Sequence, residues 1–325
     1  MNVYLPLMAA GTIVIFLLYG LYCSRSGNGN PISRRAMLTA VLALVLSVVI
    51  GTILARVGYA VMTEELDFES DGIEALLDLF DLNYDTVSFF CGAVGVCLGV
   101  LAANRLVRKD AVVEGMDAFA PFGALLAALF RMGEISFGSY GIGSNLPENS
   151  ALAFFPFALK VETAGGYSYW GWAICVLSAF FALVWACISF LKIRDHGRAG
   201  LNFTLTLFFL CLTQILCESM RKRGIFWLFV HAEQLLCAVV VTGVMLYWTI
   251  GSKGVPARRR FMPLAVLAVC TGLLVATEFA IDGKLFDLSR GVCYAFMCLL
   301  IIAIGAAGTM AARNWNRAGM GEQSV

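Results

Sequence analysis

Nine long apolar segments set the strongest constraint on what this chain can fold into. The expected membrane spans are residues 3–22, 36–62, 86–107, 118–131, 168–192, 200–218, 230–250, 261–281 and 291–312. A spanning helix needs about 20 mostly apolar residues, so segment 118–131 would cross only if neighbours bury its ends or the bilayer thins locally. The charged fraction of 14% is well below the roughly 25% of soluble domains, so we predict an all-α, polytopic transmembrane bundle of nine helices.

The basic residues outside these segments predict which way the bundle faces. Cytoplasmic loops of membrane proteins carry an excess of Lys and Arg. Here such residues gather in alternate connections and in the tail, at Arg25, Arg34, Arg35, Arg105, Arg108, Lys109, Lys192, Arg194, Arg198, Lys253, Arg258, Arg259, Arg260, Arg313 and Arg317. The connection at 63–85 is rich in Asp and Glu instead. The N-terminus is therefore expected outside and the C-terminus inside, and span 3–22, which has no basic leader, is expected to be retained.

Two connections on the expected outer side are predicted to carry structure of their own. Residues 71–83 place apolar side chains at helical spacing with acids between them, which predicts an amphipathic helix on the membrane surface. Residues 134–166 are rich in Gly, Ser and Asn and are predicted to form a small outer cap.

Arg56, Arg131 and the run 221–223 break the positive-inside pattern, because they lie at or just below the outer ends of the expected helices. Burying an arginine such as Arg56 in a bilayer costs a few kcal/mol, so it should have a partner or a function. A guanidinium presents a planar fork of donors that matches phosphate and stays charged when partly desolvated. The three sites therefore suit the headgroup of an anionic phospholipid, whereas the alternative is that each arginine snorkels or pairs with a carboxylate.

Few side chains near these arginines could serve as an acid, a base or a counter-ion. Glu218 stands one helical turn before Arg221, so it either contributes to function or forms an internal salt bridge. Glu134 stands one turn after Arg131 and could neutralise it, which would weaken phosphate binding. His231, at the outer start of a span, is either a base or a helix-end residue. The sequence shows no metal-binding, cofactor-binding or Ser/His/Asp motif and no basic face for nucleic acid, so no metal, cofactor or nucleic acid is expected.

Several short stretches resemble, in their order along the chain, the signature segments of the bacterial prolipoprotein diacylglyceryl transferase family. They are Ala55-Arg56-Val57-Gly58-Tyr59, Val87-Ser88-Phe89 with Gly92 and Gly95, Met116-Asp117-Ala118-Phe119-Ala120-Pro121, Leu129-Phe130-Arg131-Met132-Gly133, Gly138-Ser139-Tyr140-Gly141, Gln214 to Glu218 with Arg221, and Glu233-Gln234-Leu235-Leu236. The resemblance implies a seven-helix core at residues 1–250 and an extension at 251–325 with two additional spans.

The chain also departs from the family pattern at positions that matter for chemistry. It has Phe90 for a family His, Cys91 for Gly, Glu134 for Asn, Ser139 for an acid and Gln214 for Arg. The resemblance therefore implies that phospholipid binding through Arg131 carries over, whereas general-base catalysis does not carry over cleanly.

The activity that the resemblance implies is transfer of a diacylglyceryl group from phosphatidylglycerol to a lipobox cysteine thiol of signal-peptide-bearing lipoprotein precursors. The reaction would release glycerol phosphate and take place in the bacterial cytoplasmic membrane. Arg131 would hold the lipid phosphate, and Arg56 and Arg221 would add to the positive field. The further substrate-binding candidates are Gln234, Gly133 and Tyr59.

A lipobox thiol, with an ordinary pKa near 8.5, needs a base or a positive field to become the thiolate nucleophile. With Phe90 in place of the family His, His231 is the imidazole left on the outer side and is the candidate base. Glu218 would orient an arginine or the peptide. Two other functions stay open: a catalytically inactive relative that binds anionic phospholipid or a precursor, and a small-molecule membrane transporter.

Overall fold

The computed structural model describes residues 4–25, 34–63, 87–162, 166–193, 197–222, 226–227, 230–281 and 289–322. Over these residues nine helices are long and apolar enough to cross a membrane. They are α1 (Tyr4–Arg25), α2 (Arg34–Met62), α4 (Phe89–Val107), α5 (Val112–Gly133), α6 (Ile174–Lys192), α7 (Leu201–Ser219), α8 (Ala232–Gly251), α9 (Ala257–Ile281) and α10 (Arg290–Glu322). The expected polytopic bundle is confirmed, while the direction in which the termini face stays a prediction.

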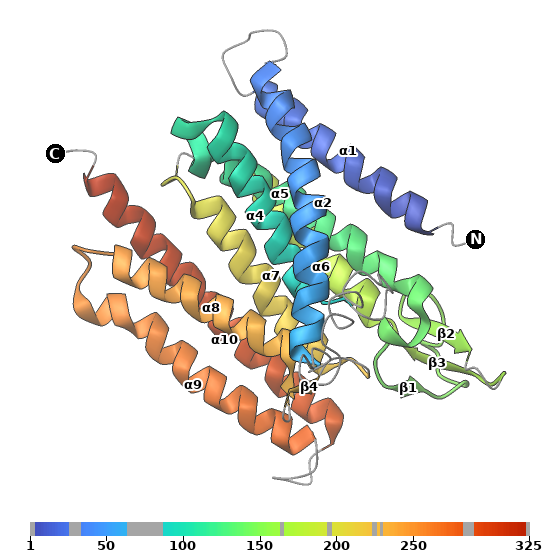
Figure 1. Ribbon diagram of the computed structural model, residues 1–325. Helices are drawn as coiled ribbons and strands as arrows, with labels where there is room; N and C mark the ends of the chain where they lie inside the picture. Colours follow the sequence, from blue (N-terminus) through green and yellow to red (C-terminus); the bar gives the residue numbers. More distant parts are fainter. Residues whose placement is uncertain are drawn as a thin grey trace, which may run out of the picture.

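The helices run alongside one another, with α1 on one side of the bundle and α9 on the other (Figure 1). Helix α2 packs along α4, α5 packs against α6, and α9 packs against α10. Two short 3-10 helices, at Lys109–Ala111 and Glu134–Tyr140, flank α5. The amphipathic helix expected at 71–83 lies outside the described residues.

Helix α5 is longer than the expected span at 118–131, and this part of the prediction was wrong. The apolar run in the sequence is interrupted by Glu114 and Asp117, yet the helix begins at Val112 and has 22 residues. Asp117 is accommodated because its carboxylate accepts the N–H groups of Gly200 at 2.6 Å and Phe203 at 2.7 Å. A helix of this length crosses a bilayer without local thinning.

These two bonds make Asp117 an N-terminal cap for α7 that is supplied by a different helix. The first N–H groups of a helix have no partner within the helix, and a carboxylate that accepts them also interacts well with the helix dipole. We expect Asp117→Ala to lower the free energy of unfolding by about 1–2 kcal/mol, the usual cost of losing a cap. The midpoint of thermal unfolding in detergent would show this, with Glu114→Ala on the exposed face of α5 as the control. Equal midpoints for the two variants would contradict the capping role.

The segment predicted as an outer cap contributes to a small antiparallel sheet at one end of the bundle, and we call this sheet the cap; that it faces outward stays a prediction. Strands β1 (Asn145–Leu146), β2 (Ala158–Glu162) and β3 (Ser168–Trp172) pair in the order β1-β3-β2. Figure 1 shows the sheet beside α5 and α6, and we call this end of the bundle the cap end. The span expected at 168–192 was therefore too long, because its first residues form β3 and α6 begins at Ile174.

Backbone contacts join this cap to the segment that follows α7. Gly143 forms an isolated antiparallel bridge with Arg221, and the Lys222 N–H donates to the Ile142 carbonyl at 3.1 Å. Close by in sequence, β4 (Phe226–Trp227) and β5 (Val230–His231) pair in a short hairpin that leads directly into α8. The cap, the end of α7 and the start of α8 are thus held next to one another.

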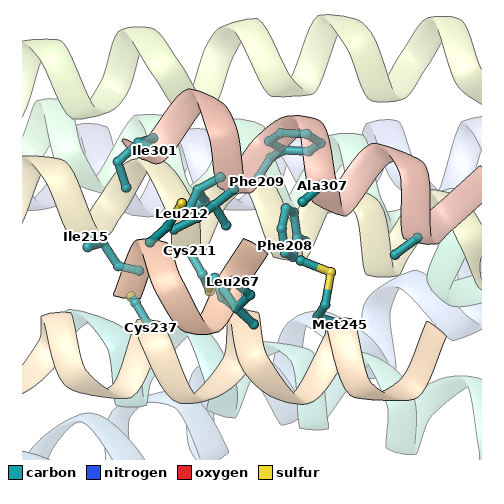
Figure 2. Close-up of a cluster of buried hydrophobic side chains, with 14 of the residues drawn as sticks. Phe208, Phe209, Cys211, Leu212, Ile215, Cys237, Met245, Leu267, Ile301 and Ala307 are labelled. Atoms are coloured by element: carbon teal, nitrogen blue, oxygen red, sulfur yellow. The ribbon is translucent and has the colours of Figure 1, made fainter. Parts of the chain in front are cut away.

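The largest buried apolar cluster lies between α7, α8, α9 and α10. Figure 2 shows Phe208, Phe209 and Leu212 of α7 against Met245 of α8, Leu267 of α9 and Ile301 of α10. Because lipid chains are as apolar as these side chains, close van der Waals packing rather than water exclusion holds such helices together. The two C-terminal helices therefore support the helices that carry part of the site described next.

Candidate functional site

Among the described residues, five charged side chains meet inside the bundle at the cap end. Arg131 lies in the last turn of α5, and Glu134 is the residue that follows this helix. Glu218 lies at the end of α7, and Arg221 lies in the segment that follows α7 in sequence. Glu233 lies in the first turn of α8. The side chains of Arg131 and Glu218 are only 2% and 3% exposed. Charges so deeply buried persist only when they are paired and hydrogen-bonded.

Arg131 is at the centre of this cluster. One end of its guanidinium, Nη1, forms an ion pair with Oε1 of Glu134. The other, Nη2, lies 3.3 Å from Oε1 of Glu218 and 3.6 Å from Oε2 of Glu233. The ring of Phe89 covers the guanidinium, with 3.6 Å between Cζ and the ring centroid, which adds a cation–π contact. Arg131 is thus held by α5, α7, α8 and the start of α4.

Arg221 binds two of the same carboxylates. Its Nη2 pairs with Oε2 of Glu134, and its Nε lies 3.1 Å from Oε1 of Glu218. Its Nη1 also approaches the Tyr140 carbonyl at 3.5 Å. Burial alone would lower the pKa of Arg221, but the Glu134 and Glu218 carboxylates outweigh it and raise the pKa, so the side chain stays charged. The two expected one-turn pairs, Arg131 with Glu134 and Glu218 with Arg221, are both present.

Two of the three carboxylates, those of Glu233 and Glu218, have hydrogen-bond partners besides the arginines. Oε1 of Glu233 accepts the Ser88 hydroxyl at 2.8 Å and the Phe90 N–H at 3.1 Å. Oε1 of Glu218 accepts the side-chain amide of Gln214, one turn earlier on α7. The side chain of Glu134, by contrast, has only the two guanidiniums as partners among the described residues.

Glu233, Phe89 and Gln214 are site residues that sequence reasoning did not assign. An acid in the first turn of a helix, such as Glu233, is ordinarily explained by the helix dipole. Phe89 and Glu233 do lie in stretches that resemble the family signature, which was the signal that could have identified them. Gln214 was noted only as a replacement for an arginine, yet its amide still contacts the acid that an arginine there could have paired with.

His231 lies beside this cluster at the start of α8. It is buried, and burial together with the nearby Arg221 lowers its pKa from 6.5 to about 4, although Glu233 opposes the shift. The imidazole is therefore neutral at neutral pH. A neutral imidazole can accept a proton, which keeps His231 available as a base, although a low pKa makes it a weak one.

This lowered pKa predicts a pH dependence of stability. The unfolded chain takes up the proton near pH 6.5 and the folded chain only near pH 4, so stability should fall as the pH drops between these values. We expect the unfolding temperature of the wild type to fall more steeply than that of His231→Asn from pH 6.5 to 4, and the two curves to run parallel above pH 7. Parallel curves over the whole range would contradict the assignment.

A single cavity of about 1960 Å³ connects this cluster to the apolar interior of the bundle. Among the described residues, the lining side chains with a guanidinium, ammonium, carboxylate or imidazole group are Arg131, Glu134, Glu218, Arg221, Lys222, His231 and Glu233, all from the cap end. The rest of its wall is mostly apolar and comes from α1, α2, α4, α5, α6, α7 and α8, reaching Val113 and Tyr247. A cavity of this size, larger than the roughly 300–1,000 Å³ of ordinary small-molecule pockets, suits an amphiphile with a polar headgroup and long apolar chains.

The other predicted site residues are distributed around this cavity. Tyr59 and Ala55 of α2 line the cavity, but Arg56, which lies between them in sequence, does not. Arg56 is buried, with its guanidinium Cζ 5.8 Å from the Tyr59 ring centroid. Gly133 is buried at the end of α5. Gln234 turns toward α9, where its amide donates to Glu278 at 2.7 Å. Arg131 and Arg221 therefore line one pocket, whereas Arg56, which was expected to join them, contributes no lining to it.

Comparison with known proteins adds one finding. The sequence model of the family described as prolipoprotein diacylglyceryl transferase matches residues 2–250. A search of curated proteins found no match. The matched region ends with α8, so α9 and α10 lie beyond it.

Proposed function

Because the chain belongs to the prolipoprotein diacylglyceryl transferase family, we propose that it transfers a diacylglyceryl group from phosphatidylglycerol to the lipobox cysteine of lipoprotein precursors in the bacterial cytoplasmic membrane. The observation that carries this proposal is the cavity with two buried guanidiniums at one end and apolar walls along the rest. A phosphodiester would lie against Arg131 and Arg221, and the acyl chains would follow the apolar walls. Guanidiniums match phosphate oxygens in geometry and charge.

The reaction breaks one bond and forms another at the same carbon of the lipid. The cysteine sulfur attacks the glycerol carbon that carries the phosphate, the S–C bond forms, and the C–O bond to phosphate breaks. Glycerol phosphate leaves with the bonding electrons, so negative charge grows on its oxygens. Cations fixed next to those oxygens stabilise that charge in the transition state. We assign this role to Arg131 and Arg221.

The thiol must lose its proton for the attack, and we assign the proton to His231. Its neutral imidazole lines the same cavity as the two arginines. Glu218 contacts both guanidiniums and so keeps them oriented. Arg56 and Tyr59 of α2, Gly133 and Gln234 are proposed to support substrate binding from the surrounding helices.

A transfer assay tests the proposal directly. The purified protein would be reconstituted in vesicles that contain phosphatidylglycerol and mixed with a lipobox peptide. The expected product is a peptide heavier by one diacylglyceryl group, detected by mass spectrometry, and none should form with a Cys→Ser peptide. A well-folded protein that yields no product, and that fails to restore growth in a strain depleted of its own transferase, would overturn the proposal.

Two observations favour the alternative of an inactive relative that binds lipid or precursor. Glu134 occupies both guanidiniums in the described structure, and Phe90 stands where the family has a histidine. Binding of phosphatidylglycerol without any transfer would support this alternative. A wild-type protein that neither binds phosphatidylglycerol nor transfers its diacylglyceryl group would exclude both functions.

A further inference from the structure

We propose that Glu134 is the residue that determines which headgroups the site accepts, because its carboxylate occupies the position that a lipid phosphate would take. This inference deepens the proposed function and rests on it for the phosphate contact at Arg131 and Arg221. The carboxylate joins both arginines, with Oε1 on Arg131 and Oε2 on Arg221. Two oxygens of one phosphate bridge a pair of guanidiniums in the same manner.

The anchoring of the three carboxylates indicates which one a ligand can displace. Glu218 is held by Gln214, and Glu233 by Ser88 and the Phe90 N–H, in addition to their arginine contacts. The side chain of Glu134 has only the two guanidiniums in the described parts of the chain. A phosphate that takes those donors therefore replaces every side-chain partner of Glu134 and leaves the other two acids anchored.

The charge around the cavity gives the same indication. Over the described residues, the lining carries three cations, Arg131, Arg221 and Lys222, and three carboxylates, so these charges cancel. An anionic headgroup adds a negative charge to this balanced set and also competes with Glu134 for the same donors. Headgroups with weaker or fewer anionic oxygens would be excluded by this competition, and a phosphodiester would bind only by displacing the acid.

Binding of short-chain lipids to the detergent-solubilised full chain tests the proposal. The probes are dioctanoyl phosphatidylglycerol, dioctanoylglycerol, which lacks the phosphate, and free glycerol phosphate, with dissociation constants from native mass spectrometry. We expect Glu134→Gln to bind dioctanoyl phosphatidylglycerol about ten-fold more tightly than the wild type, roughly the effect of freeing one charge-assisted contact. The affinity for glycerol phosphate should rise by the same factor if the headgroup alone is recognised. Dioctanoylglycerol should bind the wild type and Glu134→Gln with equal affinity.

Glu233→Gln is the matched control, because it removes the same charge from an acid that is anchored elsewhere. We expect it to change the affinity by less than about three-fold, since the Arg131 Nη2 that Glu233 contacts at 3.6 Å stays held by Glu218 at 3.3 Å. An equal gain in both variants would overturn the proposal in favour of a general charge effect, as would weaker binding by Glu134→Gln. If the wild type and both variants bind none of the phosphate-bearing probes, the proposed function fails as well. If the wild type catalyses transfer but Glu134→Gln binds phosphatidylglycerol no more tightly than the wild type, only this inference fails.

Discussion

Replacing Gly99 with leucine is expected to prevent α2 and α4 from packing and to leave little folded protein in the membrane. A Cβ at this position would lie 2.5 Å from the Ser47 N and 2.6 Å from the Ser47 Cα. One turn earlier, a Cβ at Gly95 would lie 2.6 Å from the Gly51 Cα. These are backbone atoms of α2, so no side-chain rotation can relieve the overlap, and the two helices would have to move apart.

The cause is a matched pair of small-residue rows. Gly95 and Gly99 are four residues apart on α4, and Ser47 and Gly51 are four residues apart on α2, which lets the helix backbones approach closely. The Ser47 hydroxyl also donates to the Val96 carbonyl across the interface at 3.1 Å. Overpacking a close contact typically costs about 1–3 kcal/mol, and a leucine at the tightest point should reach or exceed that range.

The control for this substitution is Gly272→Leu in α9, where nothing lies within 4 Å of the built Cβ. Size-exclusion profiles and unfolding temperatures in detergent should match the wild type for Gly272→Leu and show aggregated or absent protein for Gly99→Leu. The interface is linked to the site through Ser88, because its N–H donates to the Ala55 carbonyl of α2 and its hydroxyl donates to Glu233. The milder variant Gly99→Ala would test whether the site depends on this interface. A wild-type unfolding temperature for Gly99→Leu would show that the two helices can separate without loss.

The sequence was sufficient to predict the helices because membrane spanning imposes length and apolarity on each of them. The errors occurred where polar residues found partners that the sequence does not show. Asp117 interrupts an apolar run, but it caps α7 from another helix, and α5 is therefore longer than expected. Tyr169 and Trp170 read as the start of a span, although they form strand β3 of the cap.

The site was predictable to the extent that it is local. The pairs Arg131 with Glu134 and Glu218 with Arg221 follow from their three-residue spacing in the sequence. The contacts of Arg131 with Glu218 and of Arg221 with Glu134 each join residues 87 positions apart, and only the packing of α5 beside α7 brings them together. The packing of α8 against α9 directs Gln234 toward Glu278 of α9, a helix outside the family match, which no local pattern could indicate.

Replacing Arg131 with alanine is expected to reduce both stability and transfer activity severely, for two separable reasons. Removal of one partner from a buried ion pair leaves uncompensated charge and costs about 3–5 kcal/mol. Here the loss affects Glu134, Glu218 and Glu233 together, although Arg221 still contacts the first two. The proposed reaction also loses a cation at the leaving phosphate, which should lower the transfer rate by about a hundred-fold or more.

A compensating variant separates these two effects. In Arg131→Met with Glu134→Gln, one acid that pairs with Arg131 is removed along with the arginine, so the net charge of the cluster is unchanged. Replacing a buried ion pair by uncharged side chains is often neutral for stability. The double variant should therefore recover much of the unfolding temperature lost in Arg131→Ala while its transfer rate remains as low. Activity that returned together with stability would show that Arg131 only supports the fold. Stability without activity is the result expected of an arginine that contacts the phosphate. Arg131→Lys keeps the charge but not the fork of donors, so its transfer rate should lie between those of the wild type and of Arg131→Ala.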